Sequence, residues 1–272
     1  MTTTRSGIAY DRAGPTGAPP LVLIHAGIAD RRMWDPQWPA LTATHDVVRL
    51  DLRGYGDSTA RPADALAPAY DVIATLADLG IANAHLIGAS YGAGVAVEVA
   101  LTQPSLIESL LLSAPGGSLI AEETPQLEAF VEAEDAALDA RDLDAAVEVN
   151  LSWWVDGTMR DPERVDAGVR EFVGKMQRRA FELTADWDDV DEADFDPPTL
   201  DRLSEIDVPA LVLLGGLDLD AIHDATERVT SGIAGARRVD WADVAHLPSM
   251  ERPSDFTTLV HEWLSAPQDV GP

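Results

Sequence analysis

A serine flanked by glycines is the part of the sequence whose spacing most clearly suggests chemistry. Gly88-Ala89-Ser90-Tyr91-Gly92 follows a short apolar run and precedes a stretch rich in alanine and valine. A Gly-x-Ser-x-Gly sequence between a strand and a helix is typical of a sharp, strained turn that exposes the serine, and residues two positions away must be small to avoid clashes. The N-terminal amides of the following helix favour negative charge developing near that serine. The sequence therefore predicts Ser90 as the nucleophile of an acyl-transfer reaction.

A serine hydroxyl needs a base to remove its proton, and the base needs an acid to orient it. His246 lies in a short loop after the last apolar run. In a parallel sheet the active site gathers at the carboxyl ends of the strands, so we predict His246 as the general base. His25 is interpreted as fixing a turn rather than acting in catalysis. The other histidines lie at an expected strand start or in expected helical or surface positions: His45, His85, His223 and His261.

The expected acid follows another apolar run. Leu213-Leu214-Gly215-Gly216-Leu217-Asp218 ends a predicted buried strand and enters a loop. We therefore predict that Asp218 orients the base. Asp220 is the alternative, although a carboxylate at that position could instead cap the following helix.

An oxyanion hole requires two donors placed where the carbonyl oxygen becomes negative, and the loss of one donor typically costs roughly 10²–10³ in rate. One donor should be the backbone amide of the residue after the nucleophile, Tyr91. The other should come from the loop after the apolar run that starts at Leu21. We predict the amide of Gly27, with the amide of Ile28 as the alternative.

The elements that must position these residues alternate along the chain. Nearly continuous apolar runs are typical of strands covered on both faces, and the stretches between them have helical patterns. Such alternation predicts a mostly parallel sheet flanked by helices. The expected strands are 21–24, 46–50, 85–88, 110–112, 210–214 and 237–241, and the expected helices include 69–79, 92–102, 221–229 and 254–264.

One segment interrupts the alternation. Residues 119–205 contain no convincing strand, and they hold 25 acidic and 8 basic residues, which is -17 of the total charge. We interpret this segment as a helical cap between two core parts, 1–118 and 206–272, with a separate helical domain as the alternative. Its aromatic residues are expected in the interior of the cap more often than in a pocket wall: Phe130, Trp153, Trp154, Phe172 and Phe181.

The composition excludes several classes of function. The 272 residues include 47 acidic and 19 basic residues, a net charge of -28, which disfavours binding to nucleic acid. Cysteine is absent, so no disulfide framework, Cys-based metal site or thiol nucleophile is expected. No apolar run approaches the roughly 20 residues that span a bilayer, and no secretory signal is recognised. We expect a cytoplasmic protein without cofactor or metal; no oligomeric state is indicated.

Taken together, these blocks resemble the α/β-hydrolase family, in its capped form. The matching blocks are Leu23-Ile24-His25-Ala26-Gly27, residues 51–58, residues 88–92, Gly216-Leu217-Asp218 and residues 246–253. The resemblance implies a Ser90–Asp218–His246 triad, oxyanion amides from Gly27 and Tyr91, and turn-fixing roles for Asp51, Arg53 and Asp57. The chain departs from the family at Ala26, where glycine is usual, and its short N-terminal stretch suggests an opening hairpin reduced to one strand.

The resemblance also narrows the reaction. A serine at the turn excludes the relatives that use aspartate there, the haloalkane dehalogenases and most epoxide hydrolases. It implies an esterase or lactonase for a small or medium acyl group, with carbon–carbon hydrolysis or a non-hydrolytic receptor role as alternatives. The acidic cap favours a neutral small-molecule substrate. Arg31-Arg32 could bind a substrate carboxylate, although a solvated pair that offsets Asp30 and Asp35 is the preferred interpretation.

Overall fold

A single eight-stranded sheet runs through the protein, as a computed structural model that describes residues 2–159 and 161–266 shows. The strand order is β1-β2-β4-β3-β5-β6-β7-β8. Neighbours from β4 to β8 pair in parallel, whereas β2 pairs antiparallel with both β1 and β4. The strands are β1 (Thr2–Thr3), β2 (Ala9–Ala13), β3 (Leu21–Ile24), β4 (Val47–Leu50), β5 (Ala84–Ala89), β6 (Ile107–Ser113), β7 (Ala210–Gly215) and β8 (Arg237–Trp241).

The opening hairpin has two strands, so the expectation of one strand is wrong. β1 is only two residues long, and its residues Thr2 and Thr3 pair with Tyr10 and Ala9. The turn between the strands is closed by a hydrogen bond from the Thr4 amide to the Ile8 carbonyl, 2.9 Å long. A turn this tight lets a very short segment add a strand to the sheet edge.

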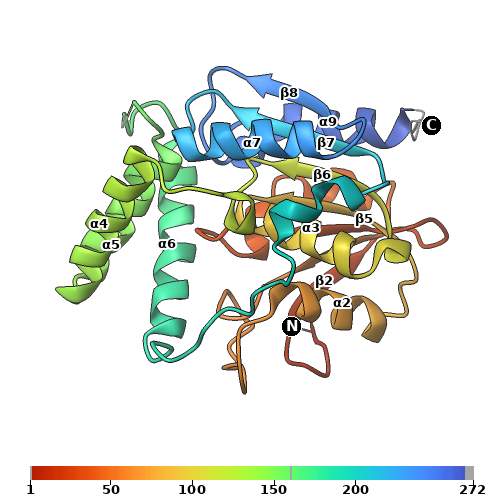
Figure 1. Ribbon diagram of the computed structural model, residues 1–272, viewed down its shortest axis with the longest axis horizontal. Helices are drawn as coiled ribbons and strands as arrows, with labels where there is room; N and C mark the ends of the chain where they lie inside the picture. Colours follow the sequence, from red (N-terminus) through yellow and green to blue (C-terminus); the bar gives the residue numbers. More distant parts are fainter. Residues whose placement is uncertain (1, 160, 267–272) are drawn as a thin grey trace.

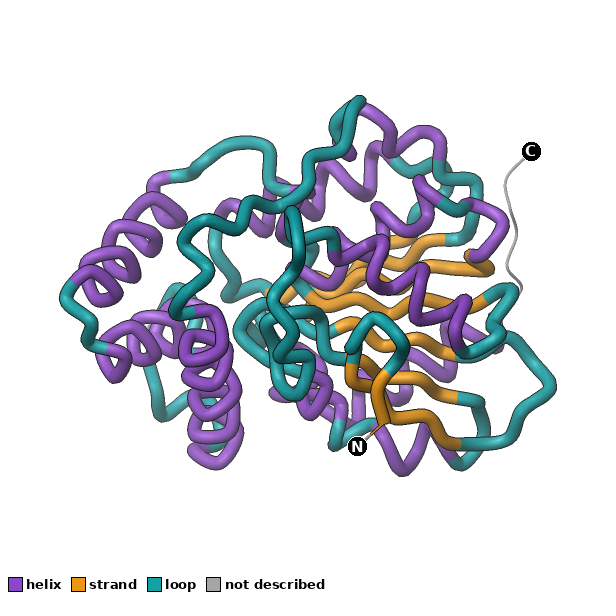
Figure 2. Tube along the Cα trace, turned by 90° about the horizontal axis from the view of Figure 1, so that it is seen from below, coloured by secondary structure: helices purple, strands orange, loops and turns teal. Residues whose placement is uncertain are grey.

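Helices cover both faces of the sheet (Figures 1 and 2). Apolar side chains alternate along β3, so that Leu21 and Leu23 face one apolar cluster while Val22 and Ile24 face the other. The first cluster includes residues of α1 and α9, and the second includes residues of α2, α3 and α7. These helices are α1 (Trp38–Thr42), α2 (Pro68–Asp78), α3 (Tyr91–Thr102), α7 (Asp220–Gly232) and α9 (Pro253–Ser265).

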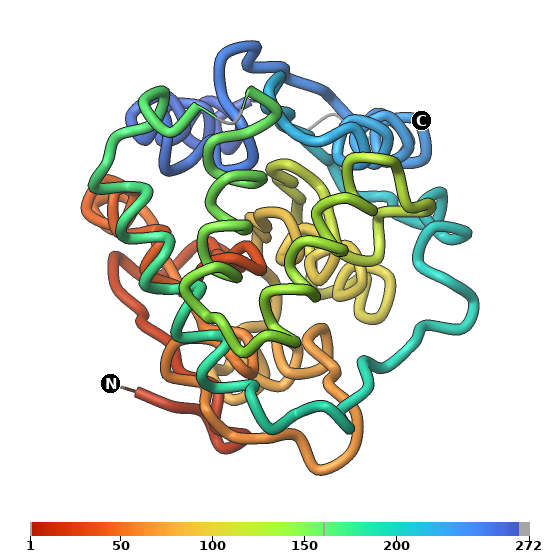
Figure 3. The backbone as a smooth tube through the Cα atoms, turned by 90° about the vertical axis from the view of Figure 1, so that its left-hand side faces the viewer, coloured from red at the N-terminus to blue at the C-terminus, as the bar shows by residue number. Residues whose placement is uncertain are grey.

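The segment between β6 and β7 is helical, and its long helices lie beyond the carboxyl ends of the strands (Figures 1 and 3). Among the described residues of 119–205, the one strand-like pairing is an isolated bridge between Glu192 and Leu66. Its apolar residues join the cluster that also contains Leu23 and Leu213, so the helical segment packs onto the sheet. Its elements are α4 (Pro125–Asp139), α5 (Leu143–Asn150), the π-helix η4 (Leu151–Val155), α6 (Ala167–Thr184) and the 3₁₀ helix η5 (Thr199–Glu205).

No helix among the described residues is long and apolar enough to cross a membrane.

Candidate active site

Ser90 occupies the turn between β5 and α3 in a backbone conformation that side-chain-bearing residues rarely adopt. Its φ is 53° and its ψ is -119°. The flanking glycines make this turn possible: a Cβ on Gly88 would lie 2.3 Å from the Gly92 carbonyl oxygen, and a Cβ on Gly92 would lie 2.5 Å from the His25 carbonyl oxygen. Strain of this kind persists only where the surrounding structure enforces it, and here it presents the Ser90 hydroxyl at the carboxyl edge of the sheet.

The three residues predicted from the sequence as nucleophile, base and acid form one chain of hydrogen bonds. His246 Nε2 lies 2.6 Å from Ser90 Oγ, and His246 Nδ1 lies 2.7 Å from Asp218 Oδ2. A carboxylate accepts only, so the Nδ1 proton is donated to Asp218 and Nε2 is free to accept the serine proton. His246 is 2% exposed and Asp218 is 3% exposed, which shields the pair from water.

The alternative acid lies away from the histidine. Asp220 accepts hydrogen bonds from the Thr124 hydroxyl and from the Ala221 amide, the latter 2.8 Å long, at the start of α7. The second oxygen of Asp218 accepts the Leu219 amide at 2.8 Å, which fixes the carboxylate plane toward His246.

His25 connects two loops through both of its ring nitrogens. Its Nε2 accepts the Leu52 amide at 2.9 Å, and its Nδ1 lies 2.9 Å from the Ala26 carbonyl oxygen, to which it donates. Burial lowers the pKa of His25, in keeping with a neutral ring that donates from one nitrogen and accepts at the other. The ring therefore holds the loop after β3 against the loop after β4.

The loop after β3 brings Gly27 beside the residue that follows the nucleophile. A Cβ built on Gly27 would lie 3.5 Å from the Cβ of Tyr91. Within residues 2–159 and 161–266, neither the Gly27 amide nor the Tyr91 amide donates to another group of the chain, and the same is true of Ile28. The proximity of Gly27 to Tyr91 favours the Gly27 amide over the Ile28 amide as the second oxyanion donor.

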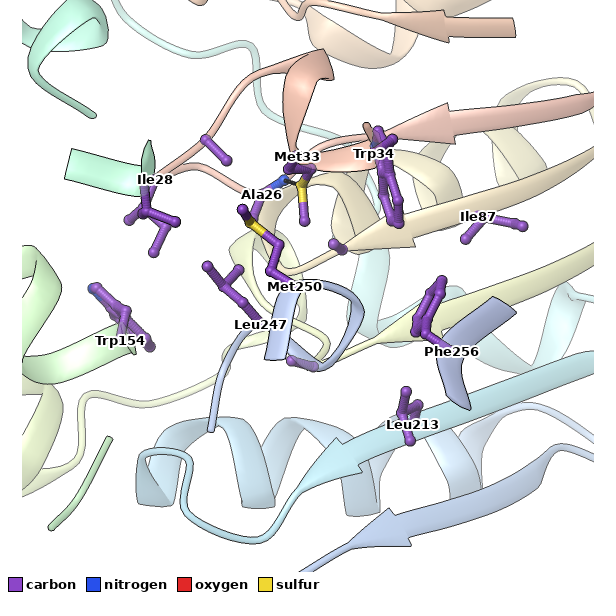
Figure 4. Packing of buried hydrophobic residues seen from close by; sticks show 14 of the residues in the cluster. Ala26, Ile28, Met33, Trp34, Ile87, Trp154, Leu213, Leu247, Met250 and Phe256 are labelled. Atoms are coloured by element: carbon purple, nitrogen blue, oxygen red, sulfur yellow. Dashed lines mark hydrogen bonds between the residues drawn. The ribbon is translucent and has the colours of Figure 1, made fainter. Parts of the chain in front are cut away.

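Ala26 lies in a part of the loop after β3 where its backbone is hydrogen-bonded and its methyl group is buried. Its amide donates to Met33 Sδ at 3.3 Å, and its carbonyl accepts the Ala29 amide at 3.0 Å. Figure 4 shows Met250 and Leu247, which follow His246 in the chain, close to Ala26 in the same apolar cluster. The methyl group that replaces the usual glycine hydrogen is fully buried.

Trp154 from the π-helix η4 contacts the histidine directly. Its ring centroid lies 4.4 Å from that of His246, and its carbonyl accepts the His246 amide at 3.3 Å. Phe130 packs edge-on against Trp154, with centroids 5.1 Å apart. Trp154 therefore contacts the site as well as the interior of the helical segment. The sequence offered Trp154 only as one of five aromatic candidates.

A largely buried ion pair ties the histidine loop to the segment 119–205, and nothing in the sequence pattern distinguished it. Glu251 accepts the Ala245 amide at 2.8 Å and is paired with Arg164. Arg164 also donates to the Val155 carbonyl at 2.7 Å, directly after Trp154. Burial raises the pKa of Glu251, although Arg164 opposes this shift. We call Arg164 and Glu251 the clamp.

Two tyrosines lie beside Gly27 in the loop after β3, and one of them is hydrogen-bonded to a glutamate. The Tyr91 hydroxyl donates to Glu192 Oε1 at 2.7 Å, and the Tyr55 hydroxyl lies 3.7 Å from a Cβ built on Gly27. Burial and the nearby carboxylates of Glu192 and Glu134 raise the pKa of Tyr55. The tyrosine hydroxyls therefore stay protonated at neutral pH. Burial also raises the pKa of Glu134 and the pKa of Glu192.

The interpretation of Arg31 and Arg32 as a solvated pair is wrong for Arg31. Its side chain is 11% exposed and forms ion pairs with Asp11, Asp51 and Asp57, because the loop after β4 folds over it. Arg32 pairs with Asp30 as expected.

Asp35 pairs with Arg49 rather than with the Arg31-Arg32 pair. Within residues 51–58, Asp51 and Arg53 connect separate loops and elements. Asp51 accepts the amides of Arg31 and Asp57, each at 2.8 Å, while Arg53 pairs with Asp71 at 2.6 Å.

Across the described residues, no group of three or more histidine, aspartate or glutamate side chains is arranged to hold a metal ion.

A mostly parallel sheet with a strained serine turn between β5 and α3 defines an α/β protein of the hydrolase type. Residues 21–258 match the Alpha/beta hydrolase family. The protein belongs to this family, as the sequence motifs predicted.

Relatives and solved structures of different activities are similar to the chain. It is 29% identical over 267 residues to the dihydrolipoyllysine-residue acetyltransferase component of the acetoin cleaving system of Cupriavidus necator, covering 94% of this chain but only 66% of that protein's length. It is 28% identical over 253 residues to the pimeloyl-acyl-carrier-protein methyl ester esterase of Neisseria meningitidis, covering 92% and 94%. The enol-lactonase from Burkholderia xenovorans LB400 has a TM-score of 0.77 and 26% identity, covering 95% of this chain and 96% of that chain.

Proposed function

We propose that the protein is an enzyme, a hydrolase that cleaves a small or medium carboxylic ester or lactone through an acyl-enzyme on Ser90. The observation that carries the proposal is the hydrogen-bonded chain from Ser90 through His246 to Asp218. The family membership supports hydrolysis, and the esterase and enol-lactonase named above support cleavage of an ester bond.

The proposed mechanism assigns one role to each residue. His246 Nε2 accepts the Ser90 proton as the serine oxygen attacks the carbonyl carbon, and Asp218 stabilises the imidazolium. The Gly27 and Tyr91 amides donate to the carbonyl oxygen as it becomes negative. His246 then gives the proton to the leaving alkoxide. A water that His246 activates attacks the acyl-enzyme, and Ser90 recovers its proton when the acid leaves.

Residues 119–205 are proposed to act as a cap between the core parts 1–118 and 206–272. Trp154 brings this segment into contact with His246, so the shape of the cap sets the space for the substrate. The acidic residues of this segment disfavour an anionic substrate, and one of them, Glu192, accepts from the Tyr91 hydroxyl beside the nucleophile turn. We therefore infer a neutral small-molecule substrate and no nucleic-acid partner.

The nucleophile is tested by labelling the protein with a fluorophosphonate and measuring its intact mass. We expect one adduct on the wild type, none on Ser90→Ala, and a loss of ester hydrolysis of at least about 10³-fold in that variant. Ser231→Ala, at an exposed serine on α7, is the control and should label normally. An unlabelled wild type, or undiminished ester hydrolysis by Ser90→Ala, would rule the proposal out.

The substrate class is tested with nitrophenyl esters of increasing acyl length, a set of lactones and a thioester. A maximum on a short or medium neutral acyl group is expected. A much higher rate on an acyl-coenzyme A than on the matching simple ester would contradict the neutral substrate. Slow turnover of every compound by a protein that still labels at Ser90 would instead favour carbon–carbon cleavage or a non-hydrolytic role.

A further inference from the structure

A cleft of about 370 Å³ lies between helix α6 and the loops that follow β3 and β4. Its walls carry five cationic side chains and two acidic ones, although the whole chain has 19 basic residues against 47 acidic ones. Figure 3 shows α6 and residues near 31 on the same side of the molecule. The lining residues are Arg31, Arg32, Gly56, Asp57, Lys175, Arg178, Arg179 and Glu182. We call this site the basic cleft.

On the side of the basic cleft formed by the loop after β3, ion pairs fix the guanidinium groups of Arg31 and Arg32. Arg31 is paired with Asp51 and Arg32 with Asp30, and both of these carboxylates are almost fully buried. Arg31 donates from Nε, Nη1 and Nη2 to three carboxylates, which leaves two of its five N–H groups without an acceptor in these ion pairs. The two arginines are therefore pre-organised, and each keeps donors for a ligand.

The helix wall presents three cations on one face of α6. Arg178 and Arg179 lie three and four residues after Lys175, the spacing that places each of them beside Lys175 on the helix surface. The acidic partners of the first two are solvated: Glu171 is 68% exposed and Asp144 is 91% exposed, and exposed ion pairs contribute little. Arg179 forms no ion pair with any residue that the structure describes. These cations can therefore bind a ligand with little loss of free energy from their present ion pairs.

We propose that the basic cleft binds the phosphate or sulfate group of a small molecule. A tetrahedral dianion offers several acceptor oxygens, so it can accept from the Arg31-Arg32 wall and from the α6 wall at once. The volume is within the range of small-molecule sites, roughly 300–1,000 Å³. The residues of the basic cleft are different from those around Ser90, and the proposal does not depend on the proposed function.

Binding is tested by calorimetric titration of inorganic phosphate at pH 8, at an ionic strength held constant with sodium chloride. We expect saturable binding by the wild type and a loss of affinity of at least tenfold in Arg178→Gln/Arg179→Gln. The charge-preserving Arg178→Lys/Arg179→Lys should lose less. Arg228→Gln on α7 removes the same charge elsewhere and should bind as the wild type does. Absence of saturable binding, or an equal loss in Arg228→Gln, would overturn the proposal.

Two further measurements separate the basic cleft from the proposed active site. Ser90→Ala should bind phosphate with wild-type affinity. This measurement therefore tests phosphate binding separately from ester hydrolysis. Phosphate should leave the KM for a neutral ester unchanged when the ligand is a separate molecule. Competitive inhibition that the two arginine substitutions abolish would instead identify the dianion as part of the substrate.

Discussion

Two aspartates lie two positions apart after β7, and their side chains have different partners. Asp218 lies 2.7 Å from His246 Nδ1, whereas Asp220 accepts from Thr124 and the Ala221 amide. Asp218→Asn should lower kcat by about 10³–10⁴, because an amide nitrogen cannot accept the imidazole proton and the wrong tautomer results. Asp220→Asn is the matched control and should stay within about threefold. The measurement is kcat for one ester by steady-state kinetics. An equal loss of kcat in both variants would contradict the assignment of Asp218 as the acid that orients His246.

The sequence predicts residues that a local turn requires. It does not identify residues that contact the site from segments distant in the chain. Gly88 and Gly92 leave no room for a Cβ, so their spacing around Ser90 identifies the turn without knowledge of the rest. Trp154 and Arg164 carry no comparable signal. They reach the histidine loop only because segments distant in sequence pack together, and helical periodicity does not tell which side chain will face the site.

At the scale of elements, the clamp links the π-helix η4 to the loop that carries His246. Arg164→Met leaves the buried carboxylate of Glu251 without its partner, and breaking a buried pair typically costs about 3–5 kcal/mol. We expect a loss of about 3 kcal/mol in unfolding free energy, measured in urea, and a fall in kcat larger than any change in KM. Arg252→Met removes a half-buried arginine from ion pairs with two exposed aspartates, Asp243 and Asp255, and should cost about 1 kcal/mol or less. Similar losses in both variants would show that the clamp has no special role.

The order of the elements is predictable where apolar runs are continuous, as in β3, β5, β6 and β7, because burial on both faces leaves a clear pattern. The sequence locates β8 equally well, although its residues are only partly covered. The two-residue strand β1 is not predictable from Thr2 and Thr3, since a turn and one sheet edge decide its pairing. The sequence pattern likewise does not indicate the π-helix at Leu151–Val155, which carries Trp154 against His246.

At the scale of the whole molecule, the net charge of -28 and the buried carboxyl groups link stability to pH. Glu98 on α3 is the clearest case, because burial raises its pKa to about 7, with Glu192 adding to the effect and Ser118 opposing it. An unfolded glutamate titrates near 4.5. Between about pH 4.5 and pH 7 the folded state therefore holds a proton that the unfolded state has released. The contribution of Glu98 to stability must then fall as pH rises through this window and level off above it.

Glu98→Gln should remove this dependence, because glutamine keeps the shape of the protonated acid and does not ionise. A difference of about 2.5 pKa units corresponds to about 3 kcal/mol. In urea titrations with constant added salt, the variant should therefore gain about 3 kcal/mol relative to the wild type between pH 5 and pH 8. Glu171→Gln, at an exposed carboxylate of α6, should show no comparable gain. Parallel pH profiles for Glu98→Gln and the wild type would mean that Glu98 ionises in the folded protein at about the same pH as in the unfolded chain, which would contradict the prediction.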